Sequence, residues 1–300
     1  MTAEGWATPG ESGNAQHGCR IGVDTYSYHR LLGEVRAGEC LPSRRMRTWA
    51  QTLNDARAAG AEVVSVQTCF MSIPDAEHIL RTQDSSRIRL AWGHPAGLQF
   101  GRSTSAEYEA GEWIRLAASL GHEQMRVVIG HHSVARDLDR QSDIRDTLPA
   151  LARLAATADR AGITLAIENH TDLTAAQLLG LLKELDHPRL QVCFDFANAL
   201  RVGDDVEEAA KLLRGWISMV HVKDITPSPH DGSSGPASTA LGAGVLPVGR
   251  LVDVLSGNEG VWLLVELGHL GPRDVDEDEM VRQGVAWLFD RVDRTAGRSP

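Results

Sequence analysis

Short apolar runs typical of β-strands recur along the chain, and each is followed by a segment with the apolar spacing of a helix. The expected strands are Arg20–Tyr26, Glu62–Thr68, Ile88–Trp92, Met125–Gly130, Ile163–Glu168, Leu190–Asp195, Ile217–Val222 and Val261–Glu266. The expected helices are Ser43–Ala59, Pro74–Thr82, Ala106–Leu120, Ser142–Ala161, Ala175–Leu185, Val206–Leu213 and Asp276–Arg294. Alternation of this kind predicts parallel strands that are joined by crossover helices.

Eight such strands in 300 residues favour an α/β fold of the (β/α)8 TIM-barrel type, in which catalytic groups lie at the C-terminal ends of the strands. An open doubly wound sheet is the alternative, but no GxGxxG turn follows the first strand. We expect one barrel domain over residues 19–296 after a disordered tail over residues 1–18. The Pro- and Gly-containing segment Thr226–Val248 is expected to be irregular, either as an active-site lid or as a mobile insertion.

Charge and cysteine content indicate which binding partners and which cellular compartment the protein has. The chain has 40 acidic and 30 basic residues, a net charge of -10, which gives no attraction to nucleic acid or to an anionic membrane. Cysteines 19, 40, 69 and 193 lack CxxC spacing, and Cys69 and Cys193 lie in apolar runs typical of buried thiols. No apolar run approaches the ~20 residues of a membrane-spanning helix. These observations favour a cytoplasmic protein without nucleic-acid or membrane partners.

Four consecutive expected strands each end in a candidate metal ligand: Glu168, Asp195, His221 and Glu266. Taken singly, a buried carboxylate is often an ion-pair partner and a buried histidine a hydrogen-bonded core residue. Desolvating an unpaired charge costs several kcal/mol, however, and neighbouring strand ends of a barrel converge at one mouth. The four together therefore predict one site. Three carboxylates and one imidazole suit Mn²⁺, Mg²⁺ or Co²⁺ better than structural zinc, and we expect Mn²⁺.

The motifs VDTYSYHR, AWGHP, IENH, FDFANA, HVKD and VELGH follow one another between Ile21 and about Phe289. In this ordered series the sequence resembles the xylose isomerase-like superfamily of sugar isomerases and epimerases. The resemblance implies that Glu168, Asp195, His221 and Glu266 bind the metal and that Glu168 and Glu266 form the acid–base pair. It also implies a small carbohydrate substrate, a homo-oligomer, and proton abstraction beside a carbonyl to give an enediolate.

Further candidate residues for substrate binding lie at or just beyond the strand ends. They are His94, His132, His170, Asn198, Lys223, Asp224 and His269, and each histidine among them is also open to a structural role. Ketose 3-epimerases of this superfamily have a histidine three residues after the strand-six aspartate, where this chain has Asn198. At this position the chain therefore differs from standard ketohexose epimerases.

The surplus histidines keep a second activity open, a lyase that eliminates the C1 substituent of a 3-keto-glycoside. The chain also resembles the catalytic subunits of C-glycoside deglycosidases, which implies a small β-rich partner subunit. Two further classes of protein are compatible with a barrel of this kind. An endonuclease IV-type DNA repair enzyme needs a three-metal cluster and a basic groove, which the acidic balance disfavours, and a non-catalytic sugar-binding barrel is compatible with the same fold.

Overall fold

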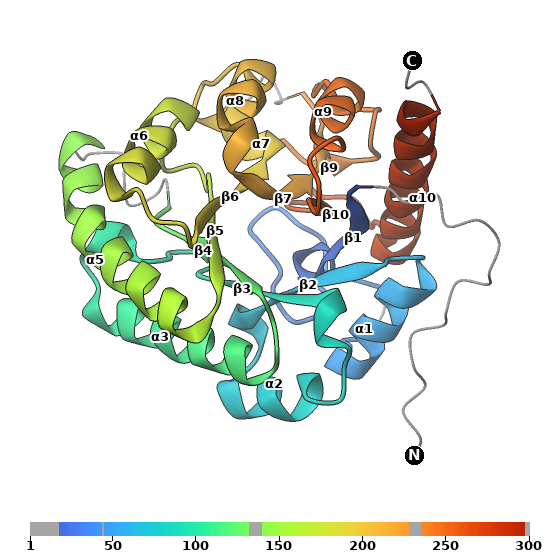
Figure 1. The fold of residues 1–300 in the computed structure, drawn as a ribbon. Coiled ribbons are helices and arrows are strands. Elements are labelled where there is room, and N and C mark those ends of the chain that lie inside the picture. The colour runs from blue at the N-terminus through green and yellow to red at the C-terminus, as the bar shows by residue number, and fades with distance from the viewer. Residues whose placement is uncertain (1–17, 44, 132–139, 228–235, 298–300) are drawn as a thin grey trace.

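The computed structural model describes residues 18–43, 45–131, 140–227 and 236–297. Among these residues, eight parallel strands close into a barrel in the order β1, β10, β7, β6, β5, β4, β3, β2 (Figure 1). The strands are β1 (Arg20–Asp24), β2 (Val63–Gln67), β3 (Ile88–Trp92), β4 (Gln124–Val128), β5 (Thr164–Glu168), β6 (Leu190–Asp195), β7 (Ile217–Val222) and β10 (Trp262–Val265). The predicted (β/α)8 barrel is confirmed.

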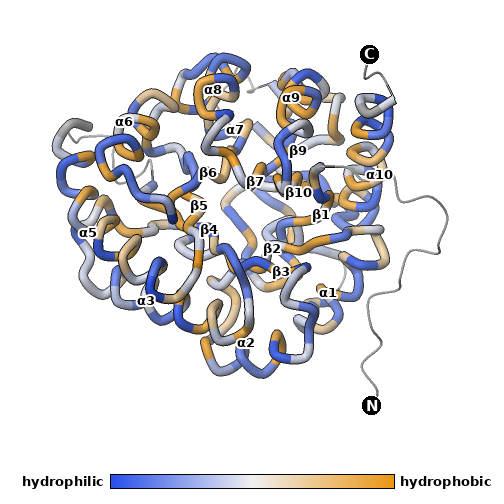
Figure 2. Tube along the Cα trace, in the orientation of Figure 1, coloured by the Kyte–Doolittle hydropathy of each residue, from blue (hydrophilic) through white to orange (hydrophobic). Residues whose placement is uncertain are grey.

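Helices ring the barrel in Figure 1. They are α1 (Trp49–Ala58), α2 (Ile73–Leu80), α3 (Thr104–Ser119), α5 (Arg140–Ala161), α6 (Ala175–Leu185), α7 (Phe196–Arg201), α8 (Val206–Leu213), α9 (Val248–Leu255) and α10 (Glu277–Ala296). Figure 2 shows hydrophobic and hydrophilic residues alternating along these helices. That is the pattern of helices with one face on a core and the other in solvent.

The strands are buried on both faces, because one face meets the helices and the other lines the barrel interior. A large apolar cluster fills the space between strands and helices. A separate small cluster comprises Val63, Ala166, Cys193, Met219, Trp262 and Leu264. Because side chains alternate along a strand, the residues two positions after Ala166, Cys193, Met219 and Leu264 share their face. Those residues are Glu168, Asp195, His221 and Glu266, so the strand period aims the predicted ligands at the barrel mouth.

Two predicted boundaries near the N-terminus were wrong. Helix α1 begins at Trp49 rather than Ser43, because Thr48 is extended and its side chain caps the helix by accepting from the Gln51 N–H. Met46, which lies before the helix, is 67% exposed. Strand β1 ends at Asp24 rather than Tyr26, because Asp24 caps a 3₁₀ helix over Thr25–Tyr28.

Two short helices and two short strands were not predicted. Helix α7 follows β6 without a break, helix α9 begins at the end of the segment that we expected to be irregular, and β8 (Asp224–Ile225) pairs with β9 (Ser238–Thr239). Residues 228–235 of that segment and residues 1–17 of the predicted tail lie outside the described residues. Cys193 is buried as expected, but Cys69 is exposed. No helix in the described ranges is long and apolar enough to cross a membrane.

Candidate metal centre

The strand register brings the predicted ligands to one level of the barrel. Asp195 on β6 is directly paired with His221 on β7, and Leu264 on β10 is paired with the same histidine. Glu168 on β5 is paired with Cys193, two residues before Asp195. Glu266 follows β10 directly. The four side chains therefore come from four adjacent strands and point into one space.

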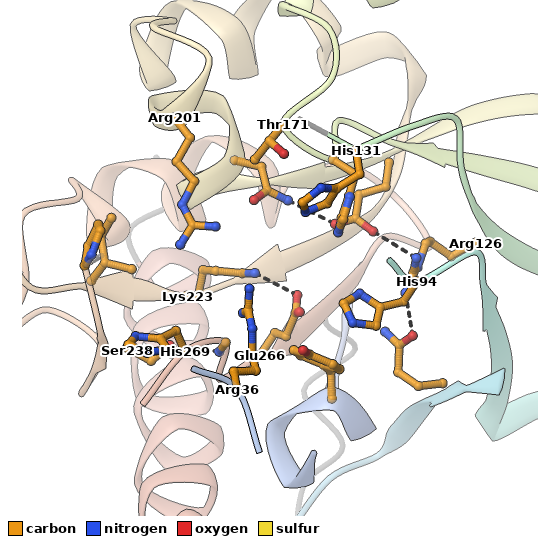
Figure 3. A pocket seen from close by; sticks show the side chains of 18 residues that line it. Arg36, His94, Arg126, His131, Thr171, Arg201, Lys223, Ser238, Glu266 and His269 are labelled. Carbon is orange, nitrogen blue, oxygen red and sulfur yellow. Dashed lines mark hydrogen bonds and ion pairs between the residues drawn. The ribbon is translucent and has the colours of Figure 1, made fainter. Parts of the chain in front are cut away.

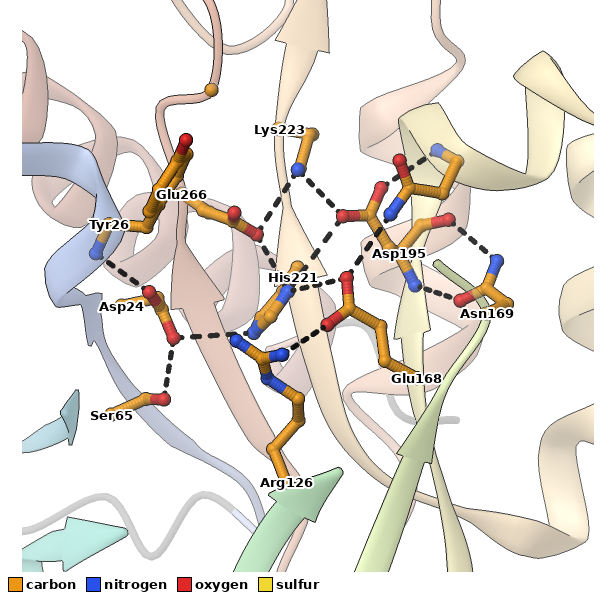
Figure 4. Close-up of polar contacts among 12 residues, drawn as sticks. Asp24, Tyr26, Ser65, Arg126, Glu168, Asn169, Asp195, His221, Lys223 and Glu266 are labelled. Atoms are coloured by element: carbon orange, nitrogen blue, oxygen red, sulfur yellow. Dashed lines mark hydrogen bonds and ion pairs between the residues drawn. The ribbon is translucent and has the colours of Figure 1, made fainter. Parts of the chain in front are cut away.

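Distances between the ligand atoms are short. One atom each of Glu168, Asp195 and His221 lies within 4.8 Å of the other two. The Nδ1 atom of His221 lies 2.6 Å from Glu266 Oε2, 3.6 Å from Glu168 Oε1 and 3.8 Å from Asp195 Oδ2 (Figure 4). All four side chains are buried. The predicted residues thus gather around a common point.

The donor set fits a divalent cation. Glu168 Oε2, Asp195 Oδ2, Glu266 Oε2 and both ring nitrogens of His221 are buried without a hydrogen-bond partner among the described residues. The Lys223 ammonium lies 2.6 Å from Asp195 Oδ2 and 3.1 Å from Glu266 Oε2, close enough for ion pairs but not in hydrogen-bond geometry. Lys223 and Arg126 supply counter-charges to these buried oxygens, which nevertheless converge near His221 without hydrogen bonds to described residues and so can also coordinate a cation. The arrangement is a candidate site for a divalent metal.

Asp24 supports the imidazole from behind. Its Oδ2 lies 3.5 Å from His221 Nε2 and accepts from Ser65 Oγ at 2.5 Å. Its Oδ1 accepts from Gln67 Nε2 at 3.0 Å and from the Tyr26 N–H at 2.8 Å. A fully buried carboxylate held by three donors fixes the ring orientation and leaves Nδ1 directed at the other carboxylates.

Glu168 and Asp195 are held by separate neighbours. The Arg126 guanidinium lies 3.2 Å from Glu168 Oε2, and Asn198 Nδ2 donates to Glu168 Oε1 at 3.1 Å. Asn169 bridges the backbone of Asp195, accepting from its N–H at 2.7 Å and donating to its carbonyl at 3.0 Å. Both carboxylates are therefore positioned before any ligand binds.

The electrostatic environment keeps both glutamates ionised. Burial raises the pKa of Glu168, but the charges of Arg126 and His221 outweigh it and hold that pKa well below its usual value. Burial acts against Glu266 in the same way, and His221 with Lys223 lowers its pKa to about 2. Both groups are thus ionised at neutral pH, whereas an acid–base pair also needs one of them protonated. Burial lowers the pKa of His221, yet Cys193 and the two glutamates raise it well above its usual value.

A polar pocket of about 620 Å³ of empty space, open to solvent, lies beside these ligands. Five predicted substrate-binding residues line it: His94, His170, Asn198, Lys223 and His269 (Figure 3). Burial lowers the pKa of His170 to about 4, so its ring is neutral at pH 7. His132, predicted for the same role, lies outside the described residues.

Asp224 is not among the residues that line the pocket. Its buried carboxylate accepts from the N–H groups of Ile225 at 2.9 Å, Gly242 at 3.0 Å, Gly244 at 2.8 Å and Leu246 at 3.1 Å. Four backbone donors occupy both oxygens. Asp224 therefore anchors the segment after β8, and the structure gives it no contact with the pocket.

Several residues of the site were missed from the sequence. Asp24 and Arg126 are charged residues within apolar strands. The same signal identified the four candidate ligands, so that criterion would have found these two residues as well. Arg36 and Arg201 also line the pocket, but one lies in a loop and the other ends a helix. Nothing in their local sequence distinguishes them from surface arginines.

The fold and the site define a (β/α)8 barrel with a buried, carboxylate-rich centre at its C-terminal mouth. Residues 53–291 match the family described as xylose isomerase-like TIM barrel, so the chain belongs to this family. A curated relative, the uncharacterized protein YihM of Escherichia coli (strain K12), is 31% identical over 119 residues, 38% of this chain and 36% of the relative. The match thus spans about a third of the relative's length.

Two solved structures share the fold over nearly the whole chain. The apo 3-keto-D-glucoside 4-epimerase from E. coli is 15% identical, with a TM-score of 0.64 and coverage of 91% of this chain and 99% of that one. A xylose isomerase-like TIM barrel protein from Mycobacterium smegmatis, in complex with magnesium, is 14% identical, with a TM-score of 0.67 and coverage of 92% and 97%. At these identities the likeness concerns the fold.

Proposed function

We propose that the chain is a divalent-metal-dependent sugar isomerase or epimerase. The observation that carries the proposal is the pair of buried, ionised glutamates, Glu168 and Glu266, on either side of His221 at a polar pocket (Figure 4). Glu168, Asp195, His221 and Glu266 would hold the ion, which we propose to be Mn²⁺ because the set is rich in oxygen. When bound, such an ion polarises a carbonyl and a neighbouring hydroxyl, which makes the adjacent carbon more acidic.

The residues of the chain then move the proton. One glutamate, ionised at neutral pH, takes the proton from the carbon beside the carbonyl, leaving an enediolate. For epimerisation the other glutamate, protonated from solvent beforehand, delivers its proton to the opposite face of the same carbon, and the first glutamate then releases its proton to solvent. For isomerisation the proton goes to the neighbouring carbon, and the hydroxyl proton passes to the former carbonyl oxygen. Lys223 and the neutral His170 line the same pocket and would donate to substrate hydroxyls.

A lyase acting on a 3-keto-glycoside is the second candidate. Three imidazoles gather on one wall of the pocket, where the His170 ring centroid lies 6.0 Å from that of His94 and 5.4 Å from that of His131. They supply more proton donors than exchange at one carbon requires, and one would protonate the departing group. The fold-level likeness to a 3-keto-D-glucoside 4-epimerase points to the same substrate type. A small β-rich partner subunit belongs to this candidate only.

Solvent deuterium incorporation tests the proposal. The metal-loaded protein is incubated in deuterated water with ketohexoses, inososes and 3-keto-glucosides, and the products are analysed by mass spectrometry. Deuterium beside a carbonyl in a sugar of otherwise unchanged structure supports isomerisation or epimerisation, whereas release of the C1 substituent supports the lyase. Glu168→Gln and Glu266→Gln should each lower the exchange rate by at least about 100-fold, because a positioned base is lost.

Glu184→Gln provides the matched control, since Glu184 is exposed on α6 away from the pocket. Its exchange rate should equal that of the unmodified protein. Exchange that persists after chelation of the metal, or in both pocket variants, would rule out the proposed mechanism. Retained sugar binding in Glu168→Gln without turnover of any sugar by the unmodified protein would favour a non-catalytic sugar-binding barrel instead.

A further inference from the structure

Two arginines enter the pocket from different parts of the chain. Arg36 lies in the loop between β1 and α1, and Arg201 is the last residue of α7. Both line the pocket, and Figure 3 shows their guanidinium groups pointing toward each other with Lys223 between them.

The backbone that carries Arg36 is fixed by a buried carboxylate. The Arg36 N–H donates to Glu39 Oε2 at 2.8 Å, and Glu39 Oε1 accepts from the Leu270 N–H at 2.7 Å. The His29 ring nitrogen Nε2 lies 3.1 Å from the same oxygen, and both side chains are fully buried. The loop is therefore tied to the barrel at the point where its arginine meets the pocket.

Arg201 is tied to the candidate metal centre through helix α7. The Oδ1 atom of Asp195 accepts from the Asn198 N–H at 2.8 Å and caps this helix, which ends at Arg201. A cation at a helix C-terminus also suits the helix dipole. Arg201 remains partly exposed to solvent; desolvation lowers its pKa, Asp195 raises it, Arg36 lowers it and Glu266 raises it. The two arginines thus repel each other within one pocket.

The other two permanent cations of the pocket have partners. Arg126 pairs with Glu168, and Lys223 pairs with Asp195 and Glu266. Within the described ranges, neither the Arg36 nor the Arg201 guanidinium forms a hydrogen bond or ion pair with a carboxylate. Two neighbouring unpaired cations in a molecule of net charge -10 lower the energy of an anion placed between them.

We propose that Arg36 and Arg201 form an oxyanion subsite, so that the substrate is a keto sugar bearing a carboxylate or phosphate. The substrate class rests on the proposed function. Guanidinium groups suit this task because each offers two parallel donors to a carboxylate or phosphate.

Calorimetric binding to the Mn²⁺-loaded protein tests the subsite without requiring turnover. The probes are D-fructose, D-fructuronate and D-fructose 6-phosphate, which separate a neutral sugar from a carboxylate and a phosphate, together with inorganic phosphate. We expect at least one anionic sugar to bind at least 10-fold more tightly than D-fructose. Arg36→Gln and Arg201→Gln should each remove most of that preference, because the loss of affinity should be much larger for the anionic sugar than for D-fructose. Arg36→Lys should restore part of it.

Arg115→Gln is the matched control, because Arg115 is an exposed arginine on α3 outside this pocket. The thermal midpoint of each variant verifies folding. Equal or tighter binding of D-fructose, equal losses for neutral and anionic sugars, or no binding of any anionic probe would overturn the subsite. Deuterium exchange with a neutral sugar alone would leave the proposed function standing without the subsite. Arginine-dependent binding of an anionic sugar without any deuterium exchange would support the subsite and contradict the proposed function.

Discussion

At the scale of single residues, the buried carboxylates differ in what each of them faces. Glu168, Asp195 and Glu266 each present a buried oxygen that lacks a hydrogen-bond donor among the described residues. Both oxygens of Asp24 instead accept hydrogen bonds, from Ser65, Gln67 and Tyr26, and one of them faces His221. Asp24 is therefore a positioning residue for the imidazole rather than a ligand.

Replacing Asp24 tests this distinction. Asp24→Asn should lower Mn²⁺ affinity by about 10- to 100-fold, because the amide no longer fixes the His221 ring with a negative charge. Calorimetric titration with Mn²⁺ measures the effect. Asp159→Asn, an exposed aspartate paired with Arg189, should leave the affinity unchanged. An unaltered affinity in Asp24→Asn would show that the imidazole needs no such support.

At the scale of elements, the segment after β8 folds around the Asp224 carboxylate, an arrangement that we call the clamp. Gly242, Gly244 and Leu246 donate their N–H groups to Asp224, and β9 pairs with β8. Gly244 approaches so closely that an added Cβ would lie 2.2 Å from Asp224 Oδ1. This clamp positions Ser238, which lines the pocket.

Gly244→Ala should therefore destabilise the fold by about 1–3 kcal/mol, because the methyl group overpacks a buried hydrogen-bonded site. Urea unfolding followed by circular dichroism measures the free energy. Gly215→Ala is the matched control, since a Cβ at Gly215 meets nothing within 4 Å. Its free energy of unfolding should change by less than about 0.5 kcal/mol. Equal effects of the two substitutions would contradict the clamp.

At the scale of the whole molecule, a buried neutral histidine makes the free energy of unfolding depend on pH. His122 is 4% exposed, and burial together with Arg89 lowers its pKa from 6.5 to about 4. Between these two values the unfolded chain binds a proton that the native protein does not bind. Stability from this group is therefore complete above about pH 6.5 and is lost as the pH falls toward 4.

The loss attributable to His122 between pH 7 and pH 4.5 is about 2 kcal/mol. His122→Gln should accordingly lose less unfolding free energy over this interval than the unmodified protein does. Urea unfolding at both pH values, with a chelator present to remove metal linkage, measures the difference. His78→Gln, on the surface helix α2, should keep the original dependence. An unchanged slope in His122→Gln would show that this histidine does not contribute to it.

The sequence by itself determined the barrel and the four side chains that converge at its mouth. Apolar runs define the strands through local side-chain alternation, and a carboxylate at the end of such a run is visible because its burial is costly. That is why Glu168, Asp195, His221 and Glu266 could be identified as a set, although their roles remain proposals.

Only the tertiary structure decided which other residues meet this set. Asp24 lies opposite His221 because the barrel closes between β1 and β10, a contact between chain segments far apart in the sequence. Arg36 and Arg201 likewise face each other only in the closed barrel. Asp224 does not line the pocket, because backbone N–H groups of a later segment hold its carboxylate. Long-range packing fixes such neighbours, and no local pattern encodes them.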